Sequence, residues 1–250
     1  MSEELETWWL LLCSAAVLNI VVWGLSAPRA PRRAMLWLSA AYVLGCAFRS
    51  VFPMIDLPRL CLHDTWISRI VVGRSVATVA ELCFAVQWAL LLRETGPGFA
   101  SRVGTLIVPL IVAAEIASWG AVLSGNYLLH AVENSLWTLS AGLAIVGFVA
   151  LRSRLDLRGQ HLVTAAAAIG GAYVAFMVLV DVPMYLSRWH ADTAAGLPFA
   201  QSVRSLLERC IVDRNWEAWR EDVAWLTLYF TVAVWISIGL AHVPPLRPRD

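Results

Sequence analysis

The sequence predicts an all-α integral membrane protein, a bundle of seven transmembrane helices with an amphipathic helix at the outer interface. Of its 250 residues, 59% are apolar and only 15% are charged. The mean hydropathy of +0.67 is well above that of a soluble domain. Seven apolar stretches reach the roughly 20 residues that cross a bilayer core of about 30 Å. We therefore expect residues 1–250 to form a single transmembrane domain.

Helix-breaking residues separate the predicted spans. Pro28 and Pro31 follow the first span, Gly96-Pro97-Gly98 follows the third, and Pro183 closes the sixth. The flank before the first span, residues 2–6, is acidic where a signal peptide is basic, so we interpret this span as an anchor. The predicted spans are residues 8–27, 34–52, 70–92, 103–123, 134–151, 161–182 and 223–242.

The distribution of Arg predicts an outer N-terminus and a cytoplasmic C-terminus. With that orientation, four short cytoplasmic segments carry ten Arg, as the positive-inside rule requires. The ten are Arg29, Arg32, Arg33, Arg93, Arg102, Arg152, Arg154, Arg158, Arg247 and Arg249.

The long outer loop before the last span predicts the amphipathic helix, over residues of about 197–220. From Phe199 to Ile211, apolar residues recur at helical spacing while the opposite face is polar. A helix this polar lies on the membrane or caps the bundle. A second interpretation is a Trp-rich docking surface for a membrane-protein partner.

Two cysteines form a candidate disulfide. Cys61 and Cys210 both fall outside the predicted spans on the outer side, and would pair if that side is oxidising. Two unpaired thiols remain the alternative.

Five ionisable residues fall within the spans or at their ends, and each is a candidate for function because charge in hydrocarbon is costly. Arg74 and Glu81 share one helix face, but a rise of about 10 Å separates them, so we expect each to reach a neighbouring helix. Arg49 or Arg74 would then pair with Asp181, and Glu81 with either Arg. The cluster could lock helices together, bind a ligand or line a transport path. The candidate ligand-binding residues are Arg49, Arg74, Glu81, Glu115 and Asp181.

Three outer histidines, each near a carboxylate, are candidate metal ligands. His63, His130 and His190 would suit zinc or copper if their loops converge. Ordinary solvated histidines are the alternative.

Composition excludes several chemistries. All nineteen basic residues are Arg, so no Lys exists to form a Schiff base with retinal or pyridoxal phosphate. A net charge of +1 gives no sign of nucleic-acid binding. The protein's surroundings are the lipid bilayer. The favoured hypothesis is an outward-facing intramembrane polar pocket for a small polar or anionic ligand, in a sensor, carrier or binding protein. The alternatives are a non-catalytic subunit of a larger membrane complex and an outer-face metal-dependent membrane enzyme.

Overall fold

A computed structural model of the protein describes residues 1–94, 98–196 and 210–246. Seven of its helices are long and apolar enough to cross a membrane. They overlap all seven spans that hydropathy predicts. The chain forms two compact units, Met1–Cys83 with Ser202–Ile238, and Phe84–Gln201 with Gly239–Asp250, called unit 1 and unit 2. The expectation of a single transmembrane domain over residues 1–250 stays a prediction.

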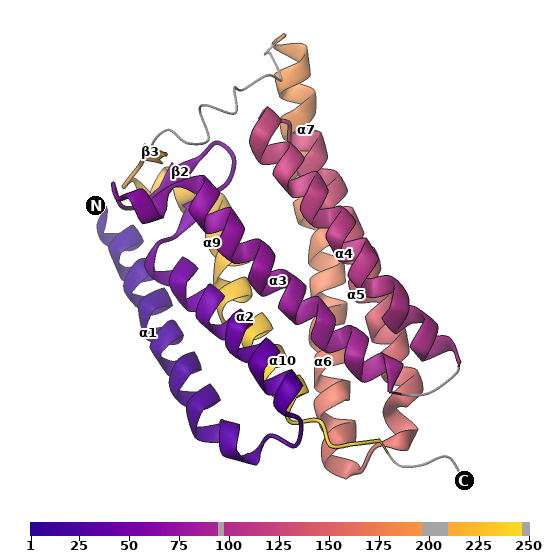
Figure 1. Cartoon of the computed structure of the whole chain (residues 1–250). Helices are drawn as coiled ribbons and strands as arrows, with labels where there is room; N and C mark the ends of the chain where they lie inside the picture. The colour runs from indigo at the N-terminus through magenta and orange to yellow at the C-terminus, as the bar shows by residue number, and fades with distance from the viewer. Residues whose placement is uncertain (95–97, 197–209, 247–250) are drawn as a thin grey trace. The chain divides into compact units, whose positions relative to one another are not determined.

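Unit 1 contains the helices α1 (Glu3–Ser26), α2 (Arg33–Val51) and the first half of α3 (Ile70–Arg93) (Figure 1). They pack with the C-terminal helices α9 (Trp216–Phe230) and α10 (Val232–Ala241), of which unit 1 includes the residues up to Ile238. The last span is therefore interrupted, because Thr231 separates α9 from α10. Asn19 of α1 is buried beside this break. Its amide donates to the Phe230 carbonyl oxygen at 2.9 Å and accepts from Trp235 Nε1 at 2.8 Å.

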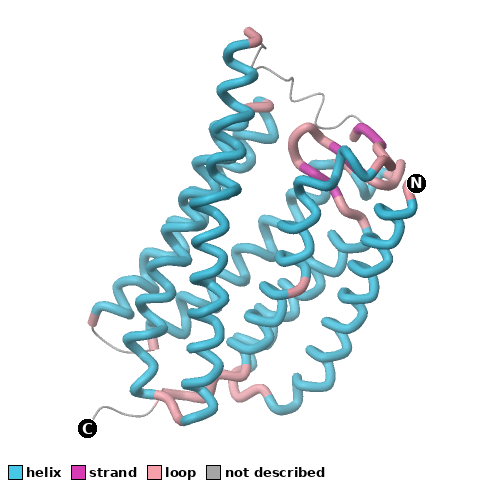
Figure 2. The backbone as a smooth tube through the Cα atoms, turned by 180° about the vertical axis from the view of Figure 1, so that it is seen from behind, coloured by secondary structure: helices cyan, strands magenta, loops and turns pink. Residues whose placement is uncertain are grey.

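A small sheet caps unit 1 beside the N-terminus (Figures 1 and 2). Strand β1 (Met54–Ile55) pairs antiparallel with β2 (Leu60–Cys61), and β2 pairs parallel with β3 (Ile211–Val212). The Ser2 amide donates to the Arg214 carbonyl oxygen at 2.9 Å, which ties the start of α1 to the segment after β3. The sequence predicted no strand here.

Only part of the predicted outer helix, over about 197–220, lies within the described residues. Residues 197–209 lie outside the described residues. Residues 211–212 form β3, and helix begins again only at Trp216, so the described part up to Asn215 is not the expected helix. This segment follows the sheet because β2 supplies hydrogen-bonding partners along the strand.

In unit 2, the second half of α3 contacts α4 (Phe99–Ser124) and α5 (Tyr127–Leu151), and α5 packs against α6 (Leu157–Phe176). Gly125 ends α4 in the left-handed conformation with φ 72°, which favours glycine. Asn126 then caps α5, its side-chain oxygen accepting from the Leu128 amide at 2.9 Å. The turn holds α4 and α5 as antiparallel neighbours. A Cβ added at Gly104 would lie 2.8 Å from the Ala89 carbonyl oxygen, so only glycine lets α4 approach α3 this closely.

The sixth predicted span does not end at Pro183. A π-helical segment, η4 (Met177–Asp181), connects α6 directly to α7 (Val182–Ala194), and the whole span runs from Leu157 to Ala194. Pro183 lies in the first turn of α7, directly after the π-helical segment, and the helix runs past it although its ring nitrogen has no hydrogen to donate to the preceding turn. The proline therefore continues the helix that we expected it to close.

Candidate functional site

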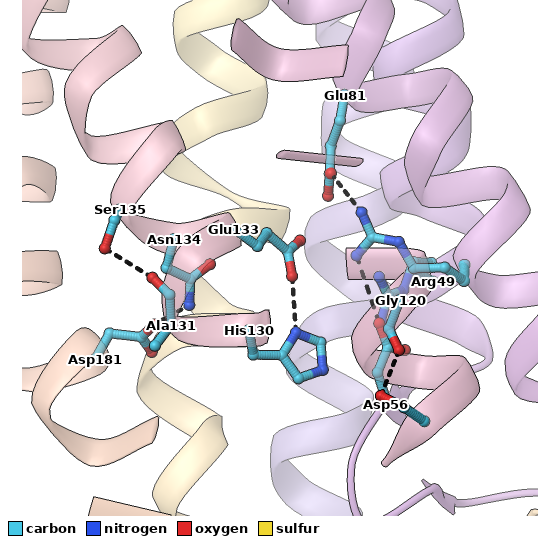
Figure 3. Close-up of polar contacts among 12 residues, drawn as sticks. Arg49, Asp56, Glu81, Gly120, His130, Ala131, Glu133, Asn134, Ser135 and Asp181 are labelled. Atoms are coloured by element: carbon cyan, nitrogen blue, oxygen red, sulfur yellow. Dashed lines mark hydrogen bonds and ion pairs between the residues drawn. The ribbon is translucent and has the colours of Figure 1, made fainter. Parts of the chain in front are cut away.

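Four charged side chains and a phenol form the main polar cluster of unit 1, the Arg49 cluster, at the end of α2 and along α3. Figure 3 shows part of its contacts. The Arg74 guanidinium lies 3.4 Å from Asp56 Oδ2 through Nη1 and 3.0 Å from Glu81 Oε2 through Nη2. Tyr229 of α9 donates its hydroxyl to Glu81 Oε1 at 2.7 Å. The members are Arg49, Asp56, Arg74, Glu81 and Tyr229.

Within this cluster Arg49 is the least closely held cation. Arg49 is 7% exposed. Its Nη2 donates to the Met54 carbonyl oxygen at 3.1 Å and lies 3.8 Å from Asp56 Oδ1. Its Nε is buried and has no hydrogen-bond partner among the described residues. Buried guanidinium N–H groups are normally all paired, so this atom retains an unused donor.

The five ligand-binding candidates from the sequence are all buried, but they divide between the two units. Arg49, Arg74 and Glu81 lie in unit 1, whereas Glu115 of α4 and Asp181 of η4 lie in unit 2, each 4% exposed. The structure therefore describes Arg49, Arg74 and Glu81 together in unit 1, and the grouping of all five residues in one site stays a prediction. Asp181, which was expected to pair with an Arg, accepts a hydrogen bond from Asn134 of α5.

The Arg74–Glu81 pair corrects the argument from helix rise. Seven residues along α3 separate them, yet their side chains meet at 3.0 Å on one face. Two long side chains lie along that face and together span the distance. Asp56 was missed altogether, because it follows β1 in a loop that the hydropathy pattern leaves outside every span.

The three histidines lie in different settings. His63 follows β2 in unit 1, His130 lies in the first turn of α5, and His190 lies in α7. The expectation that His130 and His190 occupy loops is therefore wrong, because both helices extend further than hydropathy indicates. Among the described residues, no group of three or more His, Cys, Asp or Glu side chains could hold a metal ion. The predicted zinc or copper site is not assembled in this part of the chain.

His63 has an aromatic environment rather than a metal-binding one. Its ring lies 5.2 Å from the ring of Trp9 and 5.9 Å from that of Phe52, between centroids. Burial lowers the pKa of His63 below its ordinary value, and the positive charge of Arg214 lowers the pKa further. His63 is therefore favoured in its neutral form.

The predicted cysteine pair is joined in the structure. Cys61 of β2 and Cys210, just before β3, form a disulfide with their Cα atoms 5.8 Å apart. The bond ties the loop that carries Asp56 to the segment leading into α9. Cys13, Cys46 and Cys83 are free thiols.

Comparisons with known proteins give no further guidance. No protein-family model, no curated protein and no solved structure matches the chain.

Proposed function

We propose that the protein is a multi-pass membrane protein that binds a small anionic or polar ligand at the Arg49 cluster, in a sensing, carrier or binding role. The observation that carries this proposal is the incomplete pairing of the buried Arg49 guanidinium. Guanidinium groups recognise carboxylate and phosphate through paired N–H donors. The unused Nε donor gives Arg49 capacity for one more acceptor.

In the proposal, Arg74 and Glu81 hold the other members of the Arg49 cluster in position. Arg74 reaches two carboxylates, and Glu81 accepts from both Arg74 and Tyr229. These contacts connect the Asp56 loop, α3 and α9. In the proposal they fix the Asp56 carboxylate beside Arg49, so that a ligand meets a positioned guanidinium.

We place the cluster on the outer side of the membrane, with the N-terminus outside and the C-terminus in the cytoplasm. The Arg distribution of the short connecting segments supports that orientation. The Cys61–Cys210 disulfide lies at the same end of unit 1 as the N-terminus, which is hydrogen-bonded to Arg214. Disulfides persist in oxidising compartments, and this end would then be extracytoplasmic.

Anion-dependent stability of the purified full chain tests the proposal. The protein is placed in phosphatidylcholine nanodiscs, and thermal unfolding is followed at constant ionic strength with inorganic phosphate or acetate replacing chloride. We expect a saturable rise in Tm with at least one of the two. In Arg49→Lys, the concentration for half the effect should rise at least about tenfold, because a hydrogen bond to an ionised group contributes about 1.5–3 kcal/mol. Lys keeps the charge but lacks the planar fork of donors.

Arg102→Lys is the matched control, because Arg102 is exposed in the first turn of α4. It should respond to anions as the wild type does. If neither phosphate nor acetate raises the Tm, or if Arg49→Lys and Arg102→Lys respond alike, the Arg49 cluster serves only to lock the helices.

A further inference from the structure

A buried histidine in unit 2 has one ring nitrogen paired and the other unused. His130 is 4% exposed, and its Nδ1 lies 2.7 Å from Glu133 Oε2, one helical turn along α5 (Figure 3). An ionised carboxylate only accepts, so Nδ1 carries the hydrogen and Nε2 of the neutral ring is left with a lone pair. Nε2 is buried and has no hydrogen-bond partner among the described residues.

A contact with α7 holds this ring in place. The His130 ring lies 5.2 Å from that of Tyr185, between centroids, and the Arg188 guanidinium lies 5.7 Å from the Tyr185 ring. One turn deeper, Asn134 donates to Asp181. Helix α5 therefore meets the η4–α7 segment at two successive turns: His130 contacts Tyr185, and Asn134 is hydrogen-bonded to Asp181. The histidine is held by packing on one side and by Glu133 on its own helix.

A second unsatisfied polar atom lies at a similar depth on the neighbouring helix. Ser118 of α4 is fully buried, and its Oγ has no partner among the described residues. Ser118 precedes the Gly125 turn by seven residues and His130 follows it by five, which puts both about 7–11 Å from that turn along their helices. Buried polar atoms without partners mark places where water or a ligand supplies the missing contact.

We propose that His130 is the centre of a second binding site, which takes a hydroxyl group of a neutral polyol or glycerol-type molecule. The hydroxyl donates its hydrogen to His130 Nε2. An anion is disfavoured, because the charged side chains around His130 in unit 2 include two carboxylates, Glu133 and Asp181, and one guanidinium, Arg188. A metal ion lacks the further ligands that it needs, since no group of three metal-ligating side chains occurs in the described chain. The hydroxyl could come from a lipid head group or from a free polyol.

Nitrogen NMR of ¹⁵N-histidine-labelled full chain distinguishes these sources. Three samples are compared: nanodiscs of phosphatidylcholine, whose head group has no hydroxyl; phosphatidylcholine nanodiscs containing diacylglycerol, a neutral lipid with a free hydroxyl; and phosphatidylcholine nanodiscs with added glycerol. The His130 signal is assigned with His130→Gln. We expect the Nε2 signal to move saturably in at least one hydroxyl-containing sample. In Glu133→Gln, half-saturation should need a several-fold higher concentration, because a neutral partner at Nδ1 makes Nε2 a weaker acceptor.

His190 provides the matched control, because it is an exposed histidine in the same unit. Its own signals should not move saturably, and His190→Gln should leave the His130 response unchanged. A response to diacylglycerol alone identifies a lipid site, and a response to glycerol alone identifies a site for a soluble polyol. If neither moves Nε2, or if Nε2 gives the signal of a protonated nitrogen throughout, the site is a structural pair with bound water at most.

Discussion

The two units bury charge in different ways. The Arg49 cluster of unit 1 balances two guanidinium groups against two carboxylates and draws them from α2, α3 and the loop after β1. The charges around His130 in unit 2 are arranged along helices: His130 pairs with Glu133 one turn away, and Asn134 pairs with Asp181 on the facing helix. Long-range contacts make the first cluster sensitive to the loop and its disulfide. The second combines a contact within α5 with a contact between packed helices, so it depends mainly on helix packing.

The largest expected effect comes from removing the shared carboxylate of unit 1. In Glu81→Ala, Arg74 and Tyr229 both lose a buried partner. Breaking a buried ion pair on one side costs about 3–5 kcal/mol, and thermal or denaturant unfolding in mild detergent measures the loss. Glu81→Gln, which still accepts from Tyr229, should lose less. Wild-type stability in Glu81→Ala would show that these contacts do not stabilise unit 1.

The disulfide is expected to have the next largest effect. Cys61→Ser opens a link between residues 149 positions apart, and loss of such a link typically lowers stability by about 2–4 kcal/mol. A reductant should lower the Tm of the wild type to about that of Cys61→Ser, and it should leave the Tm of this variant unchanged. Cys83 is a free thiol in α3, so Cys83→Ser is the control. Insensitivity of the wild type to a reductant that demonstrably cleaves the bond would contradict this account.

A smaller loss of stability is expected in unit 2 when the hydrogen bond between Asn134 and Asp181 is removed. Asn134→Ala removes a donor to the buried Asp181 carboxylate, and a hydrogen bond to a charged group contributes about 1.5–3 kcal/mol. Ser135→Ala changes the neighbouring exposed residue and should stay within about 0.5 kcal/mol of the wild type. Equal stabilities of the two variants would mean that Asp181 does not depend on Asn134.

The smallest effect concerns the pH dependence contributed by His63. Its pKa is lowered in the folded protein, whereas the unfolded chain has the ordinary value of about 6.5. The folded state therefore binds the proton more weakly, and stability that is complete above about pH 6.5 falls as the pH drops toward the folded pKa. His63→Gln should weaken this acid-side loss in pH-dependent unfolding, and His190→Gln should not. If the stability of His63→Gln depends on pH as that of the wild type does, His63 is not the source of the acid-side loss.

The sequence predicted the spans well, because long apolar stretches need no tertiary information to be recognised. Helix ends were less predictable. The π-helical segment before Pro183 lets one helix run from α6 into α7, and hydropathy cannot indicate such a join. Thr231 interrupts the last span within an apolar stretch, so composition gives no sign of the break.

The candidate sites were predicted only in part, for two physical reasons. Arg49, Arg74 and Glu81 are unusual in apolar stretches and could be found by inspection. Asp56 resembles any loop carboxylate until the β1–β2 pairing brings it back to the arginines. Tyr229 counts as apolar in a hydropathy window, although its hydroxyl binds Glu81. A carboxylate flanked by Pro53 and Pro58, directly between two spans that carry buried Arg, is the signal that could have identified Asp56.

The most direct test of the central claim is the NMR signal of the Arg49 Nε–H group, assigned with Arg49→Lys, during titration with inorganic phosphate or acetate in phosphatidylcholine nanodiscs. The proposed function predicts a saturable shift of this signal at the concentration that gives half the rise in Tm, with the Arg102 signal unchanged. An Arg49 signal that is observed throughout and does not move would show that the guanidinium binds neither anion.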